Sequence, residues 1–306
     1  MKVEKATKII RNGGIAAFPT ETVYGLGADA WNASAIAKIF EAKGRPSDNP
    51  LIVHVSMVDE IHAFAFDIPE KAYQLIEAFW PGPLTLVLKK KPEVLDVVTA
   101  GLNTVALRMP DHDIALELIK QTGPLVAPSA NHSGKPSPTK AVHVIEDFGE
   151  ELAVLDGNAT KIGLESTVID LTDVFPAILR PGAISRKQIE KVIGGFIEES
   201  FFHPLEKPKS PGQKYSHYKP KATVRWLEEN DSTELPYALY LLQNTTLTAH
   251  NICVYNGNLE QLAQELYDRF RQADLEGYKE VLIQQLDANH SLFSALNNRI
   301  TKAIGH

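Results

Sequence analysis

The stretch FPTETVYGLG, residues 18–27, decides how the N-terminal part of this chain is interpreted. A short apolar run at residues 15–18 predicts a strand, so two threonines and a glutamate follow where that strand ends. Taken alone, such a stretch is as compatible with an ordinary turn before a helix as with a ligand-binding site. Ligands of open α/β sheets bind beyond the carboxyl ends of strands. Polar clusters at other predicted strand ends therefore matter most.

Two further polar clusters lie at the ends of predicted elements. The segment KGRP, residues 43–46, ends a helix capped by Asn32 or Ser34. A lysine and an arginine at this place often only complement the helix dipole, but two cations around a glycine also suit a phosphate. The segment PSAN, residues 128–131, follows a short apolar run and is compatible with a cap and a turn. We treat both as candidate binding loops.

The whole chain alternates short apolar runs with helical patterns, which favours α/β architecture. Up to residue 203 the apolar runs predict strands at 15–18, 51–55, 84–88, 104–108, 125–127, 153–155, 166–171 and 177–180. The helical patterns predict helices at 3–11, 32–42, 57–65, 69–79, from 111 onward, 139–148 and 185–193. Residues 204–220 hold four prolines and few apolar side chains, which is typical of a linker. Beyond them, strands at 238–242, 252–255 and 281–284 and helices at 258–274 and 292–304 predict a small doubly wound sheet. The expected division is a domain at 1–203, a linker or lid at 204–221, and a second domain at 222–306.

Composition excludes several classes of protein. The chain has 306 residues, 44% of them hydrophobic and 23% charged, which allows a large buried core and excludes a disordered chain. We find no apolar run long enough to span a membrane and no signal peptide. The single cysteine, Cys253, cannot form an internal disulfide or a cysteine metal cluster, which fits a reducing cytoplasm. We expect a cytoplasmic protein without membrane contact, with Cys253 as a core residue of its strand.

The charge balance favours a small anionic ligand. Lys and Arg number 31 against 38 Asp and Glu, a net charge of −7 that would repel nucleic acid. From residue 222 onward there are 6 basic against 11 acidic residues, whereas the stretch before it carries five lysines without an intervening acid: Lys207, Lys209, Lys214, Lys219 and Lys221. Common nucleotide signatures are missing, since Gly134-Lys135 is followed by Pro136 and residues 25–27 lack a third glycine. A polyanionic partner would therefore have to bind in a cleft or at this lysine-rich stretch, and not along the whole surface.

Together these clusters resemble one family. Residues 19–26, the pairs Lys43-x-Arg45 and Ser129-x-Asn131, and the SPT triplet at 137–139 are similar to the motifs of the YrdC-like domain. The sequence SPGQKYSHYKP, residues 210–220, resembles the connector of the two-domain L-threonylcarbamoyladenylate synthases, apart from Gln213, where Met is more usual. Residues 293–304 resemble the last helix of that family. The resemblance spans residues 9–304, and the ordered set is much more specific than any one motif.

This resemblance implies a fold and an activity. The fold would be a twisted, open mixed sheet with helices, followed by a small Rossmann-like α/β domain. The enzyme, a nucleotidyltransferase, would make L-threonylcarbamoyl-AMP from L-threonine, bicarbonate or CO2, and ATP with Mg2+, and would release pyrophosphate. A separate transferase, a candidate protein partner, would move the threonylcarbamoyl group to the adenosine beside the anticodon of tRNAs, so that any contact with tRNA would be indirect at most.

The resemblance also implies site residues at matching positions. Catalysis would depend on Lys43, Arg45, Ser129 and Asn131, with no metal held by the protein itself. ATP would be bound by Arg45, Asn49, Thr104, Ser129, Ser137, Arg180 and Tyr218. L-Threonine would be bound by Thr22, His54, Arg108, Ala127 and Thr167.

The chemistry of these residue types suits that reaction. An anionic carbamate must approach an anionic α-phosphate, and Lys43 and Arg45 would offset the repulsion. Arg108 suits a bidentate grip on a carboxylate, whereas His54 without the resemblance is more simply a core histidine. No covalent nucleophile is needed, because the carbamate itself attacks phosphorus. One methyl group is worth only ~1–3 kcal/mol, so rejection of serine should be incomplete.

Three alternatives stay open. The linker, with Tyr215, His217 and Tyr218, is expected to close over the nucleotide as a lid, and the alternative is a passive tether. A carbamoyltransferase of the hydrogenase-maturation type would carry cysteine-rich zinc modules, against which the single cysteine argues. A non-catalytic RNA-binding module would need an aromatic stacking platform, and none is visible.

Overall fold

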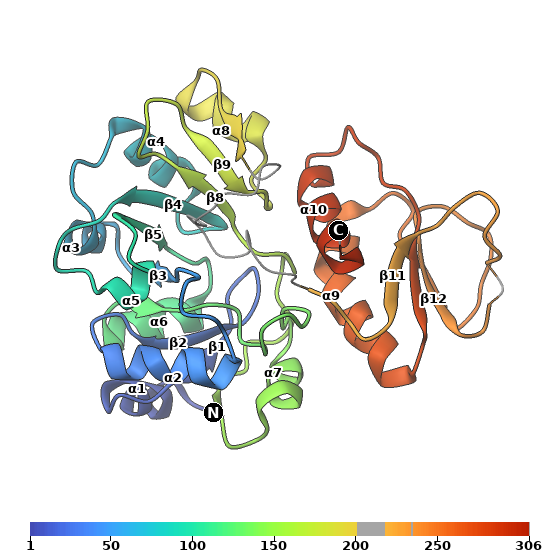
Figure 1. The fold of residues 1–306 in the computed structure, drawn as a ribbon, viewed down its shortest axis with the longest axis horizontal. Coiled ribbons are helices and arrows are strands. Elements are labelled where there is room, and N and C mark those ends of the chain that lie inside the picture. The colour runs from blue at the N-terminus through green and yellow to red at the C-terminus, as the bar shows by residue number, and fades with distance from the viewer. Residues whose placement is uncertain (201–217, 234, 306) are drawn as a thin grey trace.

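The computed structural model describes residues 1–200, 218–233 and 235–305, and these form two domains side by side (Figure 1). Predictions about residues 204–217, including most of the expected lid, lie outside the described residues. The larger N-terminal domain is built on one sheet, and the smaller C-terminal domain carries α9 (Leu259–Glu276) and α10 (Phe293–Ile304) on the side that faces its neighbour. Within these ranges, no helix combines the length and the apolar character that crossing a membrane requires.

The N-terminal sheet has ten strands in the order β10-β9-β8-β4-β5-β3-β6-β2-β1-β7. Pairing is mixed: β3 and β5 run parallel, as do β4 and β8, whereas β4 and β5 are antiparallel. The strands are β1 (Ala16–Phe18), β2 (Gly25–Asp29), β3 (Ile52–His54), β4 (Leu84–Lys89), β5 (Thr104–Arg108), β6 (Leu125–Val126), β7 (Ala153–Val154), β8 (Thr167–Asp170), β9 (Ala177–Arg180) and β10 (Glu198–Glu199).

Helices flank this sheet close to where the sequence predicts them. They are α1 (Val3–Arg11), α2 (Ala33–Lys43), α3 (Ile61–Phe64) after the 3-10 turn η1 (Val58–Glu60), α4 (Glu70–Phe79), α5 (Asp96–Thr99), α6 (Asp113–Thr122), α7 (Ala141–Phe148) and α8 (Arg186–Ile193). Asn32 rather than Ser34 caps α2, because its side chain accepts a hydrogen bond from the backbone of Ala35. Ser185 caps α8 in the same way. The expected helix over 57–65 is divided into η1 and α3, and the short α5 and β10 are not predicted.

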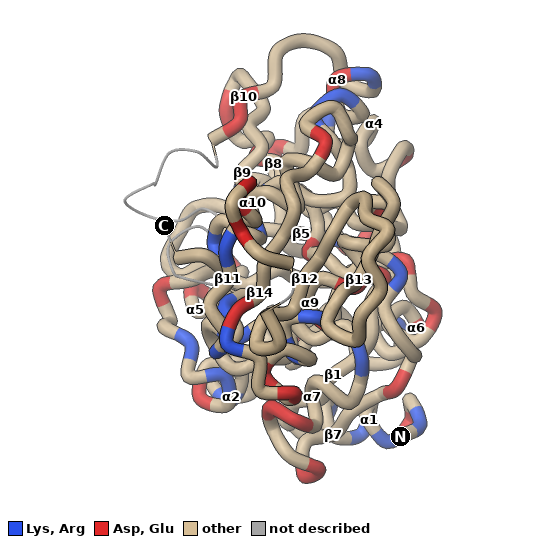
Figure 2. The backbone as a smooth tube through the Cα atoms, turned by 90° about the vertical axis from the view of Figure 1, so that its right-hand side faces the viewer, with Lys and Arg blue, Asp and Glu red and all other residues tan. Residues whose placement is uncertain are grey.

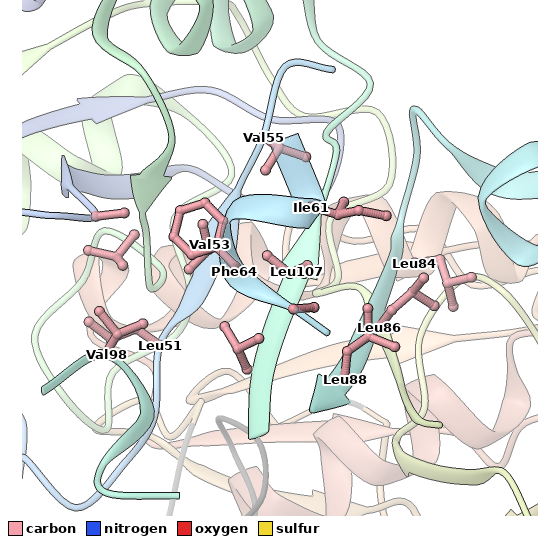
Figure 3. Close-up of a cluster of buried hydrophobic side chains, with 14 of the residues drawn as sticks. Leu51, Val53, Val55, Ile61, Phe64, Leu84, Leu86, Leu88, Val98 and Leu107 are labelled. Atoms are coloured by element: carbon pink, nitrogen blue, oxygen red, sulfur yellow. The ribbon is translucent and has the colours of Figure 1, made fainter. Parts of the chain in front are cut away.

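Alternating residues of the central strands form the main core (Figure 3). Leu84, Leu86 and Leu88 of β4 lie on one face of the sheet because strand side chains alternate. Around β3, one face of the sheet is formed by Leu51, Val53 and Val55. The side chains of Ile61 and Phe64 cover this face. This core fixes the direction of β3 and β5, at whose carboxyl ends His54 and Arg108 lie.

Phe64 should be one of the most sensitive positions of this core. Its side chain is fully buried and stacks on Trp31, with 4.6 Å between the ring centroids. Replacing it, Phe64→Ala, should lower the free energy of unfolding by about 3–5 kcal/mol. Phe66→Ala, two residues away at a side chain that is 47% exposed, should change it by less than about 1 kcal/mol. Urea unfolding of both variants measures this, and equal losses would contradict the assignment of Phe64 to the core.

The strand β2 was not expected, since glycine stands at its first and third positions, Gly25 and Gly27. The structure explains both by close packing. A Cβ atom on Gly27 would lie 2.8 Å from the ring of Phe18 in the neighbouring β1, and one on Gly25 would lie 3.2 Å from the Cβ of Ala127. Glycine is required here because another chain segment approaches too closely for a side chain. The stretch at residues 18–27 is therefore a tight connection between two antiparallel strands, not the start of a helix.

The C-terminal domain has a four-stranded parallel sheet in the order β11-β14-β12-β13, with β11 (Thr223–Trp226), β12 (Ala238–Leu242), β13 (Ile252–Val254) and β14 (Glu280–Ile283). Strand β11 was not predicted. Residues of α9 and α10 share one hydrophobic cluster with Leu239, Val281 and their neighbours, so both helices cover the same face. Loop residues such as Leu235 cover the opposite face of this sheet. The domain therefore departs from the predicted doubly wound arrangement, because no helix joins β12 to β13. Cys253 of β13 packs, half-buried, beside the helix-covered cluster.

Charged contacts join the two domains. Arg271 of α9 pairs with Asp147 of α7 at 2.8 Å, and Asp268 of α9 accepts hydrogen bonds from Lys140 and His143. Seen from the side of the C-terminal domain, acidic and basic positions are interspersed along the backbone and form no single basic band (Figure 2). These contacts fix α9 against α7 of the N-terminal domain and the residue before it.

Candidate active site

One pocket collects the polar clusters that the sequence singles out. It encloses about 720 Å3, part of it open to solvent, and lies where β3, β5 and β6 end. Eleven of the fourteen predicted site residues line it: Thr22, Lys43, Arg45, His54, Arg108, Ala127, Ser129, Asn131, Ser137, Arg180 and Tyr218. The loops that carry them are far apart in the sequence, so the order of strands in the sheet brings most of them together, and packing against the C-terminal domain adds Tyr218.

Three predicted residues lie outside this lining. Asn49 is buried, and its backbone oxygen accepts a hydrogen bond from Arg45 at 3.3 Å. Thr104 begins β5, at the opposite end of the strand from Arg108. Thr167 begins β8, and its hydroxyl donates to the carbonyl of Ile184 at 2.7 Å. Roles for these three in binding stay predictions, and the geometry gives Asn49 and Thr167 structural contacts.

Lys43 connects two of the candidate loops. It is the last residue of α2, followed by Gly44 in the left-handed conformation that ends the helix. Its ammonium group is buried and donates hydrogen bonds to the backbone oxygens of Ser129 and Asn131. Burial, with the charge of Arg45 beside it, lowers the pKa of Lys43 well below its usual value. Lys43 thus shapes the loop at residues 128–131 and lines the pocket beside Arg45.

Arg108 lies beside a carboxylate that the sequence analysis did not single out. Its Nη2 atom is 2.7 Å from Oε1 of Glu21, and both side chains are buried. The Arg108 Nε atom also donates to the carbonyl of Gly82. Among the described residues no aligned hydrogen bond reaches either carboxylate oxygen of Glu21, so the charge of Arg108 is what compensates it. Only the threonine-rich setting of Glu21 in FPTETVYGLG marks it in the sequence.

His54 lies in the pocket as a neutral ring. Burial, reinforced by the positive charge of Arg108, lowers its pKa to about 3. Its Nδ1 atom is 3.2 Å from the carbonyl oxygen of Ile52, which can only accept, so Nδ1 carries the proton. In a neutral imidazole the other nitrogen, Nε2, is then an acceptor. His54 therefore offers a hydrogen-bond acceptor to a ligand and not a positive charge.

This protonation state predicts how stability depends on pH. An unfolded histidine titrates near pH 6.5, so below that pH the unfolded chain binds a proton that the folded chain does not. The free energy of unfolding should then fall with decreasing pH, by up to about 1.4 kcal/mol per pH unit from this residue. His54→Asn should remove that slope between pH 6.5 and 4.5. Urea unfolding at several pH values compares the two chains, and parallel curves would contradict the neutral buried ring.

Glu165 is a further residue that sequence analysis missed. It lines the pocket, is only 6% exposed, and accepts a hydrogen bond from Ser137 at 2.6 Å. Arg299 and Tyr267 of the C-terminal domain contact the same carboxylate. Its place one residue before a predicted strand was the only signal, because its partners Tyr267 and Arg299 lie more than a hundred residues away in the chain.

The fold and the pocket define a class of protein: a two-domain α/β protein whose pocket, rich in arginine and lysine, suits a small anionic ligand. A family model described as "Telomere recombination" matches residues 8–182, and one described as the C-terminal domain of threonylcarbamoyl-AMP synthase matches residues 184–305. The chain belongs to the threonylcarbamoyl-AMP synthase family. The expected resemblance, fold class and enzyme class are thereby confirmed.

Full-length relatives support this assignment. The chain is 44% identical to the threonylcarbamoyl-AMP synthase of Pyrococcus abyssi over 326 residues, which cover 100% of this chain and 94% of that protein. It is also 44% identical to that of Bacillus subtilis, with 99% and 93% covered. The crystal structure of P. abyssi Sua5 complexed with L-threonine superposes with a TM-score of 0.90 at 41% identity, covering 99% of this chain and 94% of that one.

Proposed function

We propose that this enzyme makes L-threonylcarbamoyl-AMP from L-threonine, bicarbonate or CO2, and ATP, and releases pyrophosphate. The observation that carries the proposal is that a single pocket holds both an arginine suited to a carboxylate, Arg108, and a cationic corner formed by Lys43 and Arg45. The product would be used by a separate transferase that modifies the adenosine beside the anticodon of tRNAs. Acidic and basic positions are interspersed along the backbone on the side of the C-terminal domain, which favours an indirect relation to tRNA (Figure 2).

L-Threonine would occupy the end of the pocket around Arg108. The relative from P. abyssi has been crystallised with this amino acid, and its fold superposes on the present chain. Arg108 would grip the carboxylate, and the acceptor Nε2 of His54 would receive a hydrogen bond from the hydroxyl or amino group. Thr22 and the methyl group of Ala127 complete this end. A methyl contact of this kind distinguishes threonine from serine only modestly.

ATP would occupy the end around Lys43, Arg45 and the loop at residues 128–131. Phosphate oxygens accept hydrogen bonds, so they suit the guanidinium of Arg45 and the hydroxyl of Ser129. Asn131 would act by shaping the loop, because its amide nitrogen already donates to the carbonyls of His132 and Lys135. Arg180 and Tyr218 line the same side. Tyr218 is the described end of the predicted linker, and its ring is 5% exposed, so this part of the linker is packed and contributes to the pocket.

Magnesium would enter with ATP. Among the described residues no group of three His, Cys, Asp or Glu side chains could hold a metal ion. The two carboxylates nearest the pocket, Glu21 and Glu165, are already engaged by arginines. The chain's residues therefore suit a magnesium ion carried by the phosphates rather than a metal bound by protein carboxylates.

The chain's own residues would act by position and charge. Threonine, converted to its carbamate, would direct a carbamate oxygen at the α-phosphorus; that P–O bond would form as the bond to pyrophosphate breaks. Fixed cations offset the repulsion between these anions without reorganising during the reaction. Holding both reactants in one pocket removes most of the entropic cost of their meeting.

One experiment tests this function directly. The full chain is incubated with ATP, L-threonine, magnesium and labelled bicarbonate, and the products are examined by mass spectrometry and by pyrophosphate release. We expect an AMP-linked product that carries the label, and pyrophosphate release that requires both threonine and bicarbonate. Release that needs neither would overturn the proposal, and tight RNA binding without turnover would favour an RNA-binding module. Carbamoyl transfer from carbamoyl phosphate would favour the hydrogenase-maturation alternative.

A further inference from the structure

A buried cluster of polar side chains spans the two domains beside the pocket. Its centre is the carboxylate of Glu165, which belongs to the N-terminal domain. Arg299 of α10 donates to Oε2 of Glu165 from its Nε atom at 2.8 Å, and the hydroxyl of Tyr267 of α9 donates to the same oxygen at 3.0 Å. Both C-terminal side chains are fully buried. The C-terminal domain therefore reaches the wall of the pocket itself.

The charges of this cluster keep Glu165 ionised. Burial alone would raise its pKa, but the positive charges of Arg299 and Arg180, with the hydrogen bond from Ser137, lower it to about 2. Burial also raises the pKa of Tyr267 well above its usual value, so its hydroxyl keeps the proton that it donates. The carboxylate can therefore only accept hydrogen bonds, and its neighbours must donate.

The ionised Glu165 carboxylate fixes the direction of the hydrogen bond that the Ser137 hydroxyl makes. A serine hydroxyl has one hydrogen to donate and lone pairs that accept. Ser137 donates its hydrogen to Oε1 of Glu165 at 2.6 Å. Toward a ligand in the pocket, Ser137 then presents lone pairs alone. The phosphates of ATP are acceptors, so the group that meets Ser137 must be a donor of the nucleoside, either a ribose hydroxyl or the exocyclic amine of adenine.

The same C-terminal residues also position an aromatic ring of the pocket. The guanidinium carbon of Arg299 lies 5.5 Å from the centroid of the Tyr218 ring. Tyr218 stacks on Tyr267, with 5.3 Å between centroids and 26° between the ring planes. Arg299 and Tyr267 thus contact both Glu165 and Tyr218, which line the pocket, without being among the residues that line it.

We propose that Arg299 and Tyr267 are positioning residues through which the C-terminal domain completes the nucleotide pocket: they hold the Glu165 carboxylate, and Glu165 turns Ser137 into an acceptor for a donor of the nucleoside. This rests on the proposed function, since it takes the nucleotide to be ATP. Without the C-terminal contacts, Glu165 would lose its main counter-charge, and Ser137 would be free to rotate and to offer its hydrogen instead.

The test compares nucleotide binding by four forms of the full chain. Isothermal titration with ATP and, separately, with L-threonine is carried out on the wild type, Arg299→Met, Arg299→Lys and the control Arg269→Met. Arg269 also forms an ion pair with a glutamate of α9, Glu265 at 2.7 Å, but lies outside the pocket. We expect Arg299→Met to weaken ATP roughly 10-fold or more while threonine affinity changes less than about 3-fold, Arg299→Lys to recover part of the loss, and the control to match the wild type.

Nucleotide analogues identify the donor and separate positioning from a general loss of structure. The wild type should bind 2′-deoxy-ATP, 3′-deoxy-ATP or inosine triphosphate less well than ATP, according to which group meets Ser137. Arg299→Met should lose that preference, whereas a merely structural role would weaken all four nucleotides and threonine alike. Should Arg299→Met fail to fold, Tyr267→Phe, which removes only one hydroxyl, is tested instead. It should show a smaller loss of the preference for ATP over the same analogues.

The outcomes are distinct. If the Arg299 and Tyr267 variants bind ATP and its analogues as the wild type does, or lose nucleotides and threonine equally, the inference is overturned and the proposed function stands. If the wild-type chain binds no ATP, the proposed function is overturned, and this inference with it.

Discussion

Arg108→Met should abolish measurable synthesis of the adenylate. The variant loses the guanidinium proposed to grip the threonine carboxylate, and truncating one partner of a buried charge pair typically costs about 2–5 kcal/mol, which is roughly 30-fold to more than 1,000-fold in affinity. Threonine-dependent pyrophosphate release measures the effect on turnover. Titration with threonine measures the effect on binding, and ATP affinity should change much less.

The Arg108→Met variant should also be less stable, because Glu21 loses its counter-charge, and a second substitution at Glu21 tests this cause. Glu21 is buried with Arg108 as its counter-charge, so removing the arginine leaves an uncompensated carboxylate at a cost of about 3–5 kcal/mol. The double variant Glu21→Gln with Arg108→Met removes that charge and should recover much of the unfolding free energy. It should not recover threonine binding. If the double variant binds threonine, Arg108 does not hold the carboxylate.

Lys43→Met should have the second largest effect. It removes the ammonium group proposed to face the phosphates and leaves the buried carbonyl of Asn131 without its donor, whereas the carbonyl of Ser129 still accepts from the Asn131 amide. Loss of one preorganised electrostatic group commonly lowers turnover by roughly 100- to 1,000-fold, and each buried carbonyl without a donor costs about 1–3 kcal/mol. We expect a loss of activity at saturating threonine together with weaker ATP binding.

A matched control lies on the same helix. Lys38 of α2 also donates to a backbone oxygen, that of Gly13 at 2.7 Å, but its side chain is exposed. Lys38→Met should leave pyrophosphate release within about twofold of the wild type and stability within about 0.5 kcal/mol. Comparable losses in the two lysine variants would show that Lys43 supports the helix and not the pocket.

Most elements and the three polar clusters that line the pocket could be predicted from local patterns in the sequence, whereas the remaining predicted site residues came from the family resemblance. Strands such as β4 and β5 appear as apolar runs, and the residues that follow strand ends, such as those at 128–131, appear as polar clusters. The strands β2 and β11 could not be predicted in this way. For β2, glycine is disfavoured in strands in general, and the need for it arises from the ring of Phe18, which only the folded sheet brings close.

The partners of buried charges could not be predicted at all. Glu21 pairs with Arg108, and Glu165 with Arg299, across 87 and 134 residues of chain. No periodicity or spacing records such a pairing, because it depends on the order of strands in the sheet and on how the two domains dock.

The sequence by itself therefore determined the α/β architecture, the polar loops that line the pocket, and the family. Alternation of apolar and polar residues and the chemistry of turns act over a few residues, and a linear pattern preserves them. Only the tertiary structure decided which carboxylate fixes Arg108, that His54 is neutral, and that helix α10 reaches the pocket. Those features depend on burial and on charges brought close in space, and both arise only when the sheet and the second domain are assembled.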